Sequence, residues 1–179
     1  MQEPTKKKSK TVWIIVIVAG LALCVPCTGI LAAMGIPAFV GYTRRSKTAE
    51  ATSMLSSLFR GAASYYNEER SGPAGILTHC TVDSATTPNA PGRTRTLLGP
   101  LPPSFEALTF PGSDPVYYRY EIVSAGGCNH STNETLYTFR ARGDLDGDGE
   151  QSLFELSAGT DNNNELFHPP DFHRENETE

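Results

Sequence analysis

The sequence predicts an α+β fold in which a long N-terminal helix packs on a small antiparallel β-sheet. Three observations indicate this fold. No charged side chain occurs between Thr11 and Thr43, apolar residues then recur at three- and four-residue steps as far as Glu69, and two-residue alternation begins at Val116. The chain has 179 residues, of which 39% are apolar and 20% charged, so it can build one modest core.

Residues 12–43 are predicted to form a transmembrane helix. The stretch from Val12 to Val40 would be about 43 Å long as a helix, which exceeds the roughly 30 Å hydrocarbon core of a bilayer. Four lysines lie in the preceding basic tail, residues 1–11, and such a cluster predicts a cytoplasmic N-terminus with the body of the protein outside. A cleaved secretory signal and lipidation at Cys24 fit less well, because apolar sequence continues beyond either site.

Residues 44–70 are predicted to continue the same helix with one apolar face. The apolar positions alternate with charged and small polar ones at helical spacing, which is typical of a helix that packs on a core. Ser71, Gly72 and Pro73 then end the helix. The core-facing residues are Ala51, Met54, Leu55, Leu58, Phe59, Ala62, Tyr65 and Tyr66.

The remainder is predicted to be a small β-rich domain. Residues 71–115 contain eight prolines and are expected to form a loop region. Residues 116–167 alternate with a period of two, in segments separated by Gly- and Asn-rich turns, which predicts an antiparallel meander. Its apolar face has a partner in the amphipathic half of the helix. Residues 168–179 are polar and are expected to form a loose tail.

Cys80 and Cys128 fall in the predicted exported domain, where oxidation is permitted. We expect a disulfide, which would close a loop of about fifty residues and stabilise the fold by roughly 4 kcal/mol. Two free buried thiols are the alternative. Cys24 and Cys27 have the spacing of a redox motif, but apolar surroundings disfavour a thiolate, so packing is the better interpretation.

An acidic segment between the second and third predicted strands matches the twelve-residue calcium-loop pattern. Acidic residues occupy its first, third and fifth positions, glycine the sixth and glutamate the twelfth. Because the flanking segments look like strands, this would be a calcium site in a β-hairpin, not an EF-hand. A solvent-exposed acidic turn is the simpler alternative. The candidate Ca²⁺ ligands are Asp144, Asp146, Asp148, Glu150, Ser152 and Glu155.

The helix carries a family resemblance. The run from Gly29 to Pro37 is followed by Phe39 and Tyr42, then by Arg44-Arg45-Ser46-Lys47 and Ala49-Glu50-Ala51. Over roughly residues 29–69 this sequence resembles the N-terminal helix of type IV pilins and pseudopilins. The resemblance implies a pilin-like fold, in which the helix lies in the bilayer before assembly and then packs with its neighbours in a filament, and it makes calcium in a C-terminal sheet loop relevant. The implied membrane and assembly residues are Gly29, Ile30, Leu31, Ala32, Ala33, Ile36 and Pro37.

The sequence departs from the family at the leader. Pilin leaders are cut after a glycine, the mature chain begins with phenylalanine, and a glutamate follows shortly after. Counted back from Pro37, those positions are Ile15, Val16 and Gly20 here. The departure favours a pilin-like protein that keeps its N-terminal segment.

Two functions are consistent with these observations. The first is a non-enzymatic pilin-like or pseudopilin-like assembly subunit, anchored by one membrane-spanning helix, whose partners are the lipid bilayer and other pilin-like helices or a pilus or secretion platform. The second is a non-polymerising, single-span envelope binding protein of the same fold. The predicted location is a bacterial inner membrane with the C-terminal domain periplasmic or extracellular, or a pilus.

Other functional classes are disfavoured. The formal net charge of −5 argues against a nucleic-acid partner, since affinity for phosphates comes largely from lysine and arginine. No nucleophile with an adjacent base and no phosphate-binding loop is evident, so the sequence does not predict an enzyme.

Overall fold

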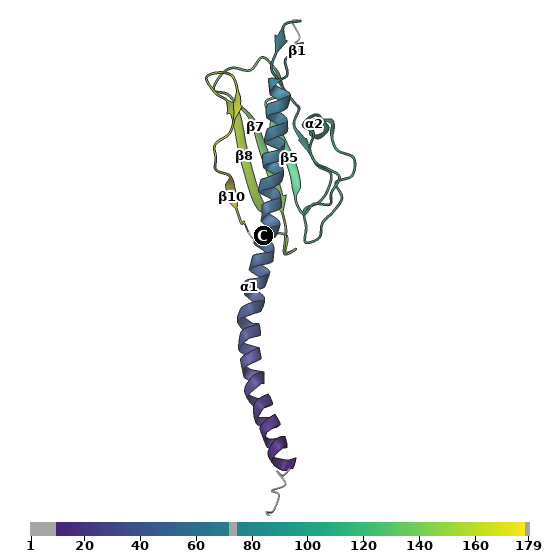
Figure 1. Ribbon diagram of the computed structural model, residues 1–179. Coiled ribbons are helices and arrows are strands. Elements are labelled where there is room, and N and C mark those ends of the chain that lie inside the picture. The colour runs from purple at the N-terminus through teal and green to yellow at the C-terminus, as the bar shows by residue number, and fades with distance from the viewer. Residues whose placement is uncertain (1–9, 72–74, 178–179) are drawn as a thin grey trace, which may run out of the picture. The chain divides into compact units, whose positions relative to one another are not determined.

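The computed structural model describes residues 10–71 and 75–177, apart from the side chains of residues 10, 11, 23–28 and 31 (Figure 1). The chain divides into two compact units, Met1–Tyr42 and Thr43–Glu179. Helix α1, Lys10–Asn67, contributes to both units. The predicted basic tail therefore lies almost wholly outside the described residues, and the predictions for the side chains of Cys24, Cys27 and Leu31 also fall outside them.

No helix in the described part of the chain is both long enough and apolar enough to cross a bilayer. The predicted transmembrane helix at 12–43 is therefore wrong, and so are the fold class that included it and the single-pass inner-membrane location. The prediction relied on the length, the apolar content and the lack of charge of the sequence, whereas the finding concerns the helices of the described residues.

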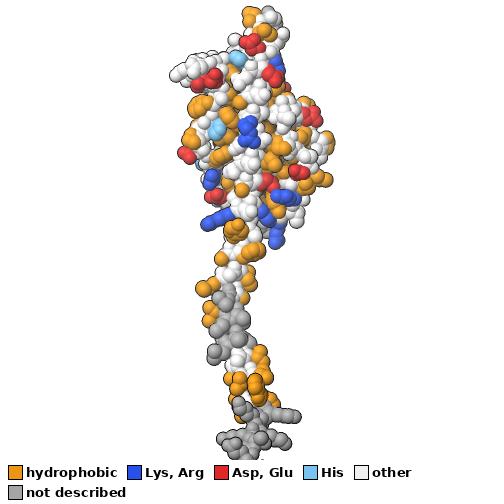
Figure 2. Space-filling model, viewed as in Figure 1, with side chains coloured by type: hydrophobic (Ala, Val, Ile, Leu, Met, Phe, Trp, Pro, Cys, Tyr) orange, Lys and Arg blue, Asp and Glu red, His pale blue; other side chains and the backbone are white. Residues whose placement is uncertain are grey.

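The first unit consists, in its described part, of the N-terminal portion of α1. Large apolar side chains are exposed along this portion, with exposed fractions from 43% at Val40 to 73% at Tyr42. Figure 2 shows them as orange side chains along the helix. The helix has no apolar stripe here, because apolar residues follow one another directly from Val12 to Val18.

The second unit combines the rest of α1 with an antiparallel sheet of six strands, so the α+β composition expected from the sequence is observed. The strand order is β10-β8-β7-β5-β4, and β9 pairs with β8 as well. The strands are β4 (Ala85–Thr86), β5 (Arg119–Ser124), β7 (Thr135–Gly143), β8 (Ser152–Thr160), β9 (Leu166–Phe167) and β10 (His173–Glu175).

Smaller elements surround the sheet. The loop region expected at 71–115 contains the five-residue helix α2 (Pro103–Ala107) and several short strands. Two-residue strands form two further ladders: β1 (Arg70–Ser71) with β2 (Leu77–Thr78), and β3 (Cys80–Thr81) with β6 (Gly127–Cys128). The segment expected to be a loose tail instead supplies β10, which pairs with β8 through His173, Arg174 and Glu175.

The core lies between α1 and the inner face of the sheet. Period-two alternation places aromatic and aliphatic side chains of β5, β7 and β8 on one face, and α1 covers that face with residues three and four apart. Each large apolar side chain buried there contributes about 1.5–3 kcal/mol to folding. The fully buried members from α1 are Ala51, Leu55, Leu58, Ala62 and Tyr66, and those from the sheet include Tyr120, Phe139, Ala141 and Phe154.

Candidate functional sites

The predicted acidic loop connects β7 to β8, the two longest strands of the sheet. One carboxylate oxygen from each of Asp144, Asp146 and Asp148 lies within 4.8 Å of the others. Asp144 and Asp146 are half-buried and Asp148 is exposed. Three carboxylates at this spacing repel one another, and Ca²⁺ prefers such hard oxygen ligands. The chemistry of the donor set therefore fits a divalent cation.

The backbone of the loop fixes these carboxylates in place. Oδ1 of Asp144 accepts a hydrogen bond of 2.6 Å from the N–H of Gly147, and Oδ1 of Asp148 accepts one of 2.8 Å from the N–H of Glu150. Gly147 and Gly149 have φ angles of 76° and 98°, which residues with a Cβ rarely adopt. The two glycines therefore allow the tight turn that gathers the aspartates.

The two predicted glutamate ligands do not join this group of carboxylates. Glu150 is exposed, and the buried Ser152 hydroxyl donates to the carbonyl of Gly143 at 3.4 Å. Oε2 of Glu155 accepts a hydrogen bond of 2.7 Å from Nε of Arg140 on the outer face of the sheet. In a helix-flanked calcium loop the glutamate at the twelfth position is a ligand. Here that position lies on a strand, which directs alternate side chains to opposite faces, and Glu155 pairs with Arg140 instead.

Helix α1 supplies a cation to the edge of the acidic loop. Nη2 of Arg44 lies 3.3 Å from Oδ2 of Asp146, and both side chains are half-buried. Sequence reasoning did not find this ion pair, because 102 positions separate the two residues and nothing in the local pattern joins them. The guanidinium partly offsets the negative charge of the loop.

Cys80 and Cys128 form a disulfide across the ladder of β3 and β6, where they are direct register partners. The predicted pairing is confirmed. The bond connects the segment after α1 to the loop between β5 and β7, so it restrains two connections that the sheet itself does not hold.

The residues assigned to assembly by the family resemblance lie on the first unit's helix. Among them, Gly29, Ile30, Ala32, Ala33, Ile36 and Pro37 are exposed, and the side chain of Leu31 lies outside the described residues. Beyond the adjoining residues and the backbone of the helix itself, no described atom lies within 4 Å of a Cβ built on Gly29 or Gly35. A second helix could therefore approach the backbone closely at these glycines.

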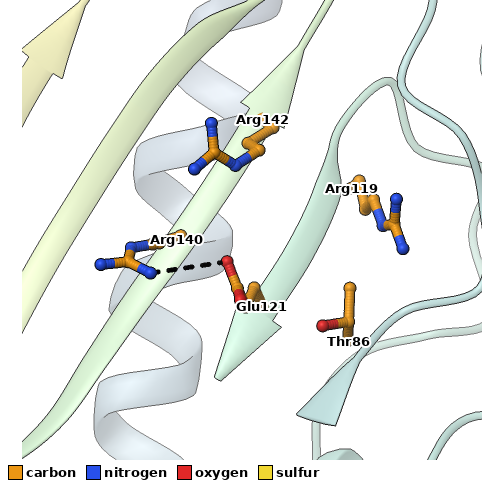
Figure 3. A pocket seen from close by; sticks show the side chains of 5 residues that line it. All are labelled: Thr86, Arg119, Glu121, Arg140 and Arg142. Atoms are coloured by element: carbon orange, nitrogen blue, oxygen red, sulfur yellow. Dashed lines mark ion pairs between the residues drawn. The ribbon is translucent and has the colours of Figure 1, made fainter. Parts of the chain in front are cut away.

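The outer face of the sheet carries a charged pocket that the sequence did not indicate. Its volume is about 310 Å³, and all of its lining residues are polar or charged (Figure 3). Glu121 lies between Arg140 on one side and Arg119 with Thr86 on the other in this view. Alternation placed the arginines on the solvent face, but only the register brings them together. The lining residues are Thr86, Arg119, Glu121, Arg140 and Arg142.

Arg140 is the paired member of this cluster. Its Nε contacts Oε2 of Glu155 at 2.7 Å, and its Nη1 contacts Oε2 of Glu121 at 3.8 Å. The hydrogen bond to Glu155 raises the pKa of Arg140, so its guanidinium remains charged. Arg119 and Arg142 are different, because no hydrogen bond or ion pair with another described residue engages either guanidinium.

Comparison with known proteins returned no matching family model, no matching curated protein and no matching solved structure.

Proposed function

We propose that this protein is a non-enzymatic, pilin-like structural subunit whose N-terminal helix packs against the same helix of other copies. The observation that carries the proposal is the exposure of the first unit's apolar side chains. Trp13, Ile15 and Ile17 are 64%, 61% and 56% exposed, and Ile36 and Phe39 are 64% and 67% exposed. A large number of exposed apolar side chains on one helix marks an interaction site.

Packing between copies would remove that surface from water. Burial of each exposed Val, Ile or Phe side chain is worth about 1.5–3 kcal/mol, and the exposed glycines leave room for close helix contact. The second unit needs no such partner for its own core, which α1 and the sheet already close. The proposal thus gives the two halves of α1 different roles, assembly in the first and core packing in the second.

We also propose that the acidic loop binds Ca²⁺. Asp144, Asp146 and Asp148 would hold the ion, and their mutual repulsion would be relieved by it. The chemistry that Ca²⁺ supplies is structural, because a bound ion would fix the β7–β8 connection at the end of the sheet. The two parts of the proposal are independent, since the loop and the exposed helix belong to different units.

The assembly role is tested by the oligomeric state of the full chain, measured by sedimentation and by electron microscopy. Ile36→Glu places a charge in the proposed helix contact and should lower the assembled fraction at least tenfold. Leu97→Glu is the matched control, because Leu97 is 65% exposed but lies in the second unit. A wild-type chain that stays monomeric, or equal loss in both variants, would refute the proposal; monomeric protein would instead fit the non-polymerising binding protein.

A further inference from the structure

We infer that the outer face of the sheet binds a small ligand bearing a phosphate or sulfate group, between Arg119 and Arg142. This site is separate from the exposed helix and from the acidic loop. It is the pocket of about 310 Å³ drawn in Figure 3, whose size suits a small organic oxyanion.

The first argument is the register of the two arginines. Arg119 of β5 and Arg142 of β7 are direct cross-strand partners, and like charges in that position destabilise a sheet. Neither guanidinium is paired with another described residue. In Figure 3 the two side chains extend in opposite directions. An anion between them would turn this repulsion into attraction.

The second argument is the pairing of the neighbouring charged side chains. Glu121 and Glu155 both contact Arg140, so these two carboxylates are directed at one guanidinium. The cluster of three arginines and two glutamates is positive, on a chain whose formal net charge is −5. The positive charge that remains is therefore concentrated on Arg119 and Arg142.

The ligand class follows from the donors that line the pocket. Guanidinium groups form paired hydrogen bonds with phosphate-like oxyanions, and the Thr86 hydroxyl supplies a further donor on the same wall. The Glu121 carboxylate in the pocket repels negative charge, so a ligand with several anionic groups is disfavoured. A single strongly charged oxyanion group on an otherwise polar molecule fits these constraints.

The test uses inorganic phosphate with the full chain at constant ionic strength, with sulfate and acetate as comparison probes. We expect phosphate to shift the side-chain Nε–Hε NMR signals of Arg119 and Arg142, and acetate to shift them at least fivefold less at equal concentration. In Arg119→Gln/Arg142→Gln the phosphate affinity measured by calorimetry should fall at least tenfold. Arg45→Gln/Arg60→Gln is the control, because it removes the same charge from exposed positions outside the pocket.

A second measurement keeps the inference testable if the double variant folds poorly. Without added anion, Arg142→Gln alone should raise the melting temperature, because it removes the like-charge pair; with phosphate, the wild type should gain more than this variant. Equal phosphate affinity in the double variant and its control, no response at either arginine, or an acetate response equal to that of phosphate would overturn the inference.

Discussion

The carboxylate of Glu50 accepts a hydrogen bond of 2.8 Å from the backbone N–H of Tyr117, which joins the middle of α1 to the segment that leads into β5. The same carboxylate contacts the Tyr120 hydroxyl at 3.3 Å and Nη2 of Arg95 at 3.5 Å. Its side chain is only 11% exposed. One acidic group therefore holds the helix, the start of the sheet and the proline-rich loop together.

Replacement of Glu50 should destabilise the second unit. Glu50→Leu leaves the Tyr117 N–H without its acceptor in a part-buried position, and an unsatisfied polar group of this kind costs about 1–3 kcal/mol. Glu50→Gln keeps an acceptor oxygen but loses the charge opposite Arg95, so its cost should be smaller. Urea unfolding of the full chain measures both, with the exposed Glu106→Gln as control. Equal stability of Glu50→Leu and wild type would show that the contact contributes nothing.

The role of Glu50 could not be predicted from the sequence. The amphipathic pattern alone indicates that Glu50 lies on the solvated face of the helix, because a charged residue in such a pattern is normally exposed. The partner that buries it lies 67 positions away. The same limit applies to Arg44 with Asp146 and to Arg119 with Arg142, since local periodicity gives the face of a residue but not its neighbour across the fold.

Local patterns succeeded where the local signal was strong. The alternation around Tyr120 and Phe139 predicted two central strands, helical spacing from Ala51 to Tyr66 predicted the core face of α1, and the acidic spacing brought three aspartates together. The transmembrane prediction did not hold, since no helix among the described residues is both long enough and apolar enough to span a bilayer. Strand β10 was missed because its three residues are exposed and polar, and only pairing with β8 orders them.

The stability of the second unit should fall at alkaline pH. Burial raises the pKa of Tyr120 well above its ordinary value of 10, and the nearby Glu50 carboxylate raises it further. Burial also raises the pKa values of Tyr118 and Tyr137. Above about pH 10 the unfolded chain releases phenolic protons that the folded chain retains, so the free energy of unfolding decreases as pH rises. Below that pH this contribution is fully present.

Urea midpoints measured between about pH 8 and pH 11 check this expectation. In Tyr120→Phe the loss of stability with rising pH should be smaller, because this variant lacks one of the tyrosines whose pKa is raised in the folded state. Tyr42→Phe is the control, since Tyr42 is 73% exposed and belongs to the first unit. A Tyr120→Phe variant with the same pH slope as wild type would contradict the assignment.

Calcium should stabilise the second unit through the acidic loop. At a Ca²⁺ concentration of a hundred times Kd, binding to the folded state adds about 2.7 kcal/mol, and the melting temperature should rise accordingly. Asp144→Asn/Asp148→Asn should abolish the rise. Asp114→Asn/Asp171→Asn removes the same charge from exposed positions outside the loop and should keep it. An identical melt with Ca²⁺ and with chelator would exclude the site.

Arg44 should oppose Ca²⁺ binding. Its guanidinium lies 3.3 Å from Oδ2 of Asp146, so Arg44→Gln removes a positive charge beside the proposed ion. An ion pair of this exposure is worth roughly 0–1 kcal/mol, and calorimetry should therefore find up to about a fivefold higher Ca²⁺ affinity. Arg45→Gln changes the neighbouring exposed arginine and serves as the control. Weaker Ca²⁺ binding in Arg44→Gln would mean that Arg44 positions Asp146 for the ion instead of competing with it.

Substitution of Gly61 tests how closely α1 approaches the turn after α2. On helix propensity alone, Gly→Ala inside a helix stabilises by about 1 kcal/mol. A Cβ on Gly61, however, would lie 2.0 Å from the carbonyl oxygen of Leu108 and 2.9 Å from its carbonyl carbon. Because both are backbone atoms, the helix or the turn must move, and overpacking of this kind costs about 1–3 kcal/mol.

We therefore expect Gly61→Ala to lower the urea midpoint of the full chain, although alanine has the higher helix propensity. Gly41→Ala is the matched helical control, because beyond the adjoining residues and the backbone of the helix itself no described atom lies within 4 Å of a Cβ at Gly41. It should be neutral or slightly stabilising. The opposite signs of the two substitutions separate close packing from propensity. If Gly61→Ala were as stable as Gly41→Ala, the turn after α2 would have to lie farther from α1 than its carbonyl position indicates.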